Sequence, residues 1–109
     1  MLRVIDRETI DEAARRLLEA APDGSRVILF GSYARGDADP RSDVDFLVVE
    51  PEVADVVAEE VRLINAMRPM RLAVDVAVMS AKEFDSWKDT PNTLAYRAVR
   101  EGETHGPLR

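Results

Sequence analysis

The sequence predicts an α/β domain in which a small mixed β-sheet of three core strands is packed with helices. Short apolar, β-rich runs alternate along the chain with segments of helical spacing. The 109 residues match the size of one domain, and no repeat or linker divides them. We therefore expect residues 1–109 to form a single domain.

The first half of the chain predicts a helix, a strand and a polar connection. Residues 7–21 carry apolar side chains at helical spacing, and Pro22 and Gly24 end that helix. Residues 26–31, RVILFG, are short and β-rich and predict a buried strand. Residues 32–42 predict a short helical turn followed by a loop.

Two further strands flank the next predicted helix. Residues 43–50, DVDFLVVE, predict the second strand, and residues 71–79, RLAVDVAVM, predict the third. We expect the helix between them to open at Pro51 and to stop at Pro69. Its expected apolar stripe consists of Val53, Val57, Val61 and Ile64.

Short helices are expected in the last third of the chain. Ser80 with Glu83 makes a capping box for a helix through Trp87. Thr90-Pro91 predicts the start of another helix that ends near residue 100. The tail, EGETHGPLR, is expected to be loosely packed.

Composition argues against several classes of function. Cysteine is absent, so disulfides and thiolate metal sites are excluded. The formal net charge is −6 and no block of Lys or Arg occurs, which argues against direct nucleic-acid binding. The N-terminal stretch is charged throughout, and no apolar run approaches membrane-spanning length. We expect a cytoplasmic protein that is not bound to a membrane.

Two carboxylates lie at the start of the second predicted strand. Asp43 and Asp45 lie two residues apart, so their side chains point to the same face. Two close carboxylates repel each other unless a cation joins them, and Mg²⁺ prefers such oxygen ligands. The alternative is a polar start of an exposed strand, and a lone D-x-D does not exclude it.

A third carboxylate, Asp75, lies among apolar neighbours in the third predicted strand. A strand that is apolar on both faces predicts a buried central position. A carboxylate there is costly unless it is paired or bound to a metal. The residues alone leave open whether Asp75 joins a metal site or pairs with Arg35 or another arginine.

A Gly-Ser pair ends the first predicted strand. Gly31 lets another group approach the backbone closely, and Ser32 would open a short helix whose free N–H groups favour a phosphate. Arg35 lies one turn further on, where it can contact the phosphate or pair with Asp37 or Asp39.

These parts predict one site only if the first two strands run antiparallel. The third strand returns through a helical crossover, so the sheet is expected to be mixed. A phosphate cradle beside three carboxylates is typical of a two-metal site. In such sites, ions about 3.5–4 Å apart clamp the attacking and leaving oxygens of a phosphoryl displacement.

The stretch GSYARGDADPRSDVDFLVV resembles the minimal nucleotidyltransferases, small members of the DNA polymerase β-like nucleotidyltransferase superfamily. The shared signature is a Gly-Ser pair, ten residues and then Asp-Val-Asp. Asp75 falls where the family places its third carboxylate. The resemblance covers residues 8–101 and implies the nucleotidyltransferase fold.

The resemblance also implies a reaction: transfer of AMP from ATP to an acceptor, with release of pyrophosphate. Asp43 and Asp45 would bind two Mg²⁺ ions, and Asp75 would complete the site or help to deprotonate the acceptor. The implied nucleotide-binding residues are Gly31, Ser32 and Arg35.

Stand-alone members of this size resemble the antitoxins of HEPN–MNT toxin–antitoxin pairs. The implied partner is a HEPN ribonuclease toxin, and the implied acceptor is one of its tyrosines. One alternative is an antitoxin that covers its toxin with little catalysis, and another is a small-molecule nucleotidyltransferase. Docking of a toxin would require an exposed apolar patch.

Overall fold

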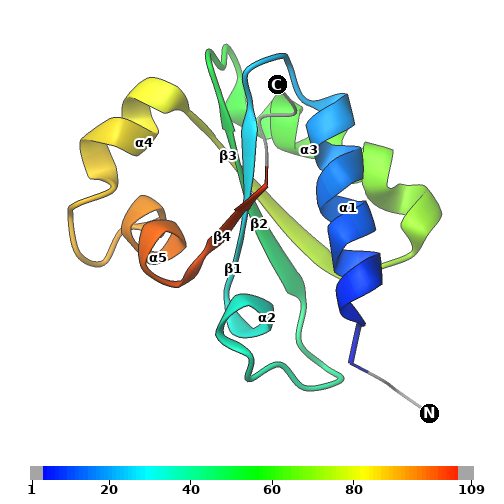
Figure 1. Cartoon of the computed structure of the whole chain (residues 1–109). Coiled ribbons are helices and arrows are strands. Elements are labelled where there is room, and N and C mark those ends of the chain that lie inside the picture. The colour runs from blue at the N-terminus through cyan, green and yellow to red at the C-terminus, as the bar shows by residue number, and fades with distance from the viewer. Residues whose placement is uncertain (1–3, 106–109) are drawn as a thin grey trace.

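The computed structural model describes residues 4–105, which form a four-stranded mixed sheet in the order β3-β2-β1-β4 (Figure 1). β1 (Arg26–Phe30) runs antiparallel to β2 (Val44–Glu50), and β2 runs parallel to β3 (Val74–Ser80). β4 (Glu103–His105) pairs antiparallel with β1. The predicted α/β class, with antiparallel first strands and a parallel crossover, is confirmed, and the structure adds a fourth strand.

Helices cover both faces of the sheet (Figure 1). α1 (Arg7–Ala20) and α3 (Val56–Met67) lie on one face, and α4 (Ala81–Trp87) and α5 (Leu94–Glu101) lie on the other. The short α2 (Ser32–Arg35) follows β1 directly. No helix within residues 4–105 is long and apolar enough to cross a membrane.

Each face of the sheet has its own apolar core. Residues of the central strands alternate between the two faces, so Phe46 packs with α1 and α3, whereas Leu47 packs with α4 and α5. The face of β2 that carries Leu47 also carries Asp45. The side chain of Asp45 therefore points to the α4 and α5 side of the sheet.

Two predicted helix starts are wrong. No helix opens at Pro51; α3 begins after Asp55, whose carboxylate accepts a backbone N–H at 3.1 Å. Thr93, rather than Thr90, caps α5. Each helix instead starts at a residue whose side chain accepts a free N–H group of the first turn, Asp55 for α3 and Thr93 for α5.

Most of the apolar stripe predicted for this helix faces outward, whereas its first member, Val53, lies before α3 and packs against the core. Val57, Val61 and Ile64 are 69%, 53% and 38% exposed, whereas Leu63 and Met67 are buried. Apolar residues occur on both sides of this helix, so their spacing did not reveal which side meets the sheet. α3 thus has a buried apolar face and an exposed one.

Predictions about the third strand and the tail also need correction. β3 is an edge strand rather than a central one, and its apolar character reflects contact with α3 on one face and α4 on the other. Residues 103–105 are not loose, because they form β4; residues 106–109 lie outside the described part. Gly102 permits this turn, since an added Cβ would lie 2.1 Å from the carbonyl oxygen of Ala98.

Candidate functional site

One end of the sheet brings together residues that are distant in sequence. The antiparallel register pairs Phe30 with Asp45, which places Gly31, directly after β1, beside Asp45. The parallel register pairs Asp45 with Asp75 on the neighbouring strand. Two of the three predicted carboxylates and the Gly-Ser turn therefore meet at the same end of the sheet.

Gly31 is needed for the contact between this turn and Asp45. Its backbone has φ +79°, and an added Cβ would lie 2.2 Å from Oδ2 of Asp45. A side chain here would strain the backbone and displace the carboxylate. Ser32 begins α2, as predicted, and is half-buried.

The electrostatic environment of Asp45 favours a neutral group or a bound cation. Burial raises the pKa of Asp45, and the carboxylates of Asp75 and Asp43 raise it further. The positive charge of Arg97 lowers the pKa of Asp45, but the net shift of that pKa is upward. A cation held between these carboxylates would relieve the repulsion.

Asp43 and Asp75 are both exposed. The prediction of a buried Asp75 is wrong, because β3 lies at the sheet edge. The alternative ion pair with Arg35 does not form either, since no arginine of residues 4–105 lies within ion-pair distance of Asp75. Within that range, no group of three or more His, Cys, Asp or Glu side chains is arranged to hold a metal ion.

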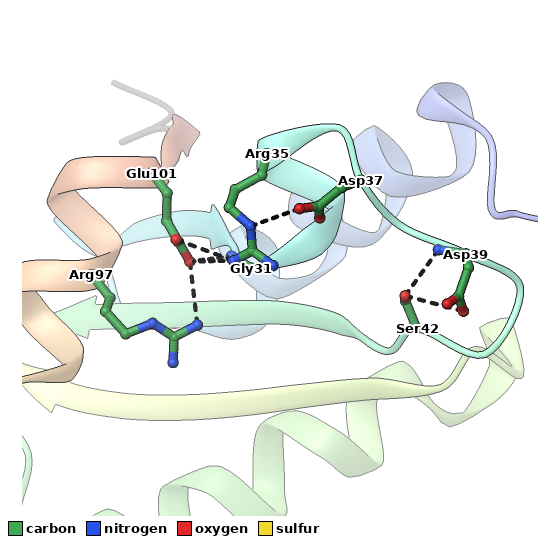
Figure 2. Close-up of polar contacts among 7 residues, drawn as sticks. All are labelled: Gly31, Arg35, Asp37, Asp39, Ser42, Arg97 and Glu101. Atoms are coloured by element: carbon green, nitrogen blue, oxygen red, sulfur yellow. Dashed lines mark hydrogen bonds and ion pairs between the residues drawn. The ribbon is translucent and has the colours of Figure 1, made fainter.

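The predicted phosphate cradle holds a carboxylate of the chain itself (Figure 2). Glu101, at the end of α5, accepts the N–H of Gly31 at 2.8 Å. Nη1 of Arg35 lies 3.2 Å from both carboxylate oxygens of Glu101, and Nη2 of Arg97 lies 3.3 Å from Oε1. Arg35 also donates from Nε to Asp37 at 3.2 Å, so the predicted pairing with Asp37 occurs.

The groups that bind the Glu101 carboxylate form an anion-binding site. Burial raises the pKa of Glu101, but the Gly31 N–H and the Arg35 guanidinium lower it more, and the net shift is downward. The same donors are suited to phosphate oxygens, because phosphate also accepts N–H and guanidinium hydrogen bonds.

Sequence reasoning missed Arg97 and Glu101. Their spacing of four residues indicated only a helical ion pair, and nothing local to α5 connected that pair to the Gly-Ser turn. A cation–π contact positions the Arg97 side chain: its guanidinium lies 5.4 Å from the centre of the Phe30 ring, at the end of β1.

The loop that leads into Asp43 is held by its own polar groups (Figure 2). The N–H of Asp39 donates to Oγ of Ser42 at 3.0 Å, and the Asp39 carboxylate accepts the N–H of Arg41 at 2.8 Å. These bonds order the connection between α2 and β2 without using the side chain of Asp43.

Comparison with known proteins identifies relatives of this chain. The family model described as a nucleotidyltransferase domain matches residues 10–100. A protein of Methanocaldococcus jannaschii, named as a protein adenylyltransferase, is 43% identical over 53 residues. That match covers 49% of this chain and 52% of the relative, so it spans about half the length of each.

Solved structures share the fold. A nucleotidyltransferase from Sulfolobus solfataricus is 28% identical, with a TM-score of 0.57 over 75% of this chain and 73% of that one. A toxin–antitoxin structure with AMP-PNP is 19% identical, with a TM-score of 0.58 over 92% of this chain and 72% of that one. At 19% identity, the second likeness shows the fold alone.

Proposed function

This chain belongs to the nucleotidyltransferase domain family, as its sequence motif indicated, and on that premise we propose that it transfers AMP from ATP to an acceptor hydroxyl. The observation that carries the proposal is the sheet end where Asp45 lies beside Asp75 and next to Gly31. In the reaction, the acceptor oxygen bonds to the α-phosphorus as the bond to pyrophosphate breaks. The site must therefore bind a triphosphate and remove the proton of the acceptor.

We assign Asp43, Asp45 and Asp75 to holding two Mg²⁺ ions. Mg²⁺ binds through one or two carboxylates and completes its shell with water and substrate phosphates, so it does not require three converging side chains. The raised pKa of Asp45 supports this assignment, because a bound cation offsets the repulsion that raises it. The ions would neutralise charge on the attacking and leaving oxygens.

The remaining roles belong to the groups around Gly31. The Gly31 N–H, the Ser32 hydroxyl and the Arg35 guanidinium bind the triphosphate after Glu101 has moved away. Asp75 is exposed at the sheet edge, where an incoming hydroxyl can reach it, and it takes the proton or completes the metal site.

The acceptor in this proposal is a tyrosine of a cognate HEPN-type ribonuclease toxin, which the chain neutralises as its antitoxin. The relative named as a protein adenylyltransferase supports a protein acceptor, and the toxin–antitoxin neighbour supports a toxin partner. The exposed face of α3, formed by Val57, Val61 and Ile64, offers an apolar surface of the kind that a protein partner covers.

The experiment combines the purified chain, Mg²⁺, α-labelled ATP and the product of the adjacent gene. We expect label on a tyrosine of that partner, and loss of label with Asp45→Asn. Asp89→Asn, an exposed aspartate between α4 and α5, is the matched control and should label normally. Equal labelling by Asp45→Asn would contradict the assigned site.

A second candidate function is neutralisation by binding alone. The exposed apolar face of α3 favours it, because binding to a partner needs no catalytic step. It predicts a stable complex without label, and neutralisation that survives Asp45→Asn. Label on a small molecule such as an aminoglycoside, rather than on protein, would instead indicate a small-molecule nucleotidyltransferase.

A further inference from the structure

A second polar site lies at the other end of β2 from the aspartates. Glu50, the last residue of β2, is 2% exposed, and its Oε2 has no hydrogen-bond partner among residues 4–105. The residue lines a pocket of about 480 Å³. This volume is within the range of small-ligand sites.

Carboxylates dominate the polar lining of this pocket. Glu52 and Asp55 come from the segment before α3, and Glu59 and Arg62 come from α3 itself. Arg62 donates to both oxygens of Glu59, at 2.8 and 2.6 Å, so the one cation of the lining is already engaged. The other lining residues are Pro22, Val53, Ala54 and Ala58.

No group of residues 4–105 donates a hydrogen bond to Oε2 of the buried Glu50 carboxyl. Burial and a hydrogen bond shared with Glu59 raise the pKa of Glu50 to about 8, so near neutral pH the Glu50 carboxyl of the free protein carries a proton, which it shares with Glu59. The ionised form of this buried carboxyl is costly, and a cationic donor would offset that cost and replace the proton. A ligand that complements this lining would therefore supply a positively charged group with several N–H donors.

We propose that this pocket binds a primary ammonium group on a short apolar stem. An ammonium has three donors and no acceptor, which suits a wall of carboxylate oxygens. It contacts Glu50 and Glu59, and its methylene stem packs on Pro22 and Val53. A linear diamine and the lysine side chain of a bound protein both carry this chemistry.

The test titrates the full chain with 1,5-diaminopentane and with N-acetyl-lysine amide by calorimetry at pH 7. We expect saturable binding of at least the diamine and, because Glu50 loses its proton, proton release that differs between buffers of different ionisation enthalpy. Glu50→Gln should weaken binding by about tenfold or more. Glu83→Gln, on the opposite face of the sheet, should leave it unchanged.

The two ligands distinguish the source of the ammonium group. Binding of both supports a lysine side chain, and binding of the diamine alone supports a free amine. Ala58→Trp fills the pocket from an exposed position, so it should abolish binding even if Glu50→Gln alters the fold. The proposal would be overturned if neither ligand bound, or if folded Glu50→Gln or Ala58→Trp bound the diamine as tightly as wild type.

Discussion

Replacing Glu101 by glutamine should strengthen nucleotide binding while weakening the free fold. Glu101 occupies the donors that we assign to the triphosphate, so a phosphate must displace it. Glutamine keeps an oxygen that can accept the Gly31 N–H but removes the charge that pairs with Arg35 and Arg97. Displacement of this side chain therefore costs less in the variant.

The expected gain in ATP affinity follows from how exposed the ion pairs of Glu101 are. The Glu101 side chain is 19% exposed, whereas those of Arg35 and Arg97 are 42% and 53% exposed. Each of these ion pairs is screened by solvent and contributes about 0.2–1 kcal/mol. The substitution also weakens the charge-assisted hydrogen bond to Gly31. Together these losses lower the free energy of displacing the side chain by about 1–2 kcal/mol. This corresponds to a gain of about 5–30-fold in affinity for ATP.

The assay is calorimetric titration of ATP with Mg²⁺ into wild type, Glu101→Gln and Glu19→Gln. Glu19 is exposed on α1 and serves as the matched control. Affinity that is unchanged or lower in Glu101→Gln would refute the competition between Glu101 and phosphate. Wild-type protein that binds no ATP at all would instead count against the proposed function.

Four further changes test other parts of the structure. Gly31→Ala should destabilise the fold by about 1–3 kcal/mol from its backbone conformation alone, and more from the clash with Asp45, as measured by chemical unfolding. Asp45→Asn should raise the melting temperature of the free chain, because the upward pKa shift means that the charged form is disfavoured. The same variant should lose the stabilisation by Mg²⁺ and ATP, about 2.7 kcal/mol at a hundredfold excess over Kd in wild type. The pKa of Glu50 rises from 4.5 to about 8 on folding, so its contribution to stability is complete below pH 4.5 and is lost as the pH rises through 8. Melting temperatures from pH 5 to 9 should therefore fall less steeply for Glu50→Gln than for wild type. Val61→Asp, at a position that is 53% exposed, should change stability by no more than about 0.5 kcal/mol yet abolish the complex with the partner on gel filtration.

Each of these expectations has a contrary outcome. Wild-type stability in Gly31→Ala would contradict both the backbone strain at this position and the clash with Asp45. Retained stabilisation by Mg²⁺ and ATP in Asp45→Asn would remove this residue from the metal site. Parallel pH profiles would show that Glu50 does not titrate with folding, and an intact complex in Val61→Asp would place the partner elsewhere.

Local chemistry in the sequence determined much of the fold. The periodic apolar residues of α1 and the Ser80 cap of α4 were predicted correctly, because each depends on contacts within one or two helical turns. The Gly-Ser turn and the Asp-x-Asp pair predicted the antiparallel arrangement of β1 and β2, since only that arrangement brings them to one sheet end. The family followed from the same short segment.

Only the tertiary structure decided which faces and ends meet. The position of β3 at the sheet edge, and therefore the exposure of Asp75, depends on strand order, which local spacing does not encode. The predicted buried stripe of α3 was wrong for a similar reason, because both sides of the helix are apolar and their spacing does not tell which side meets the sheet. Glu101 binds the N–H of a residue 70 positions earlier in the chain. Such a bond exists only after α5 has packed on the sheet, so no pattern within either segment could reveal it.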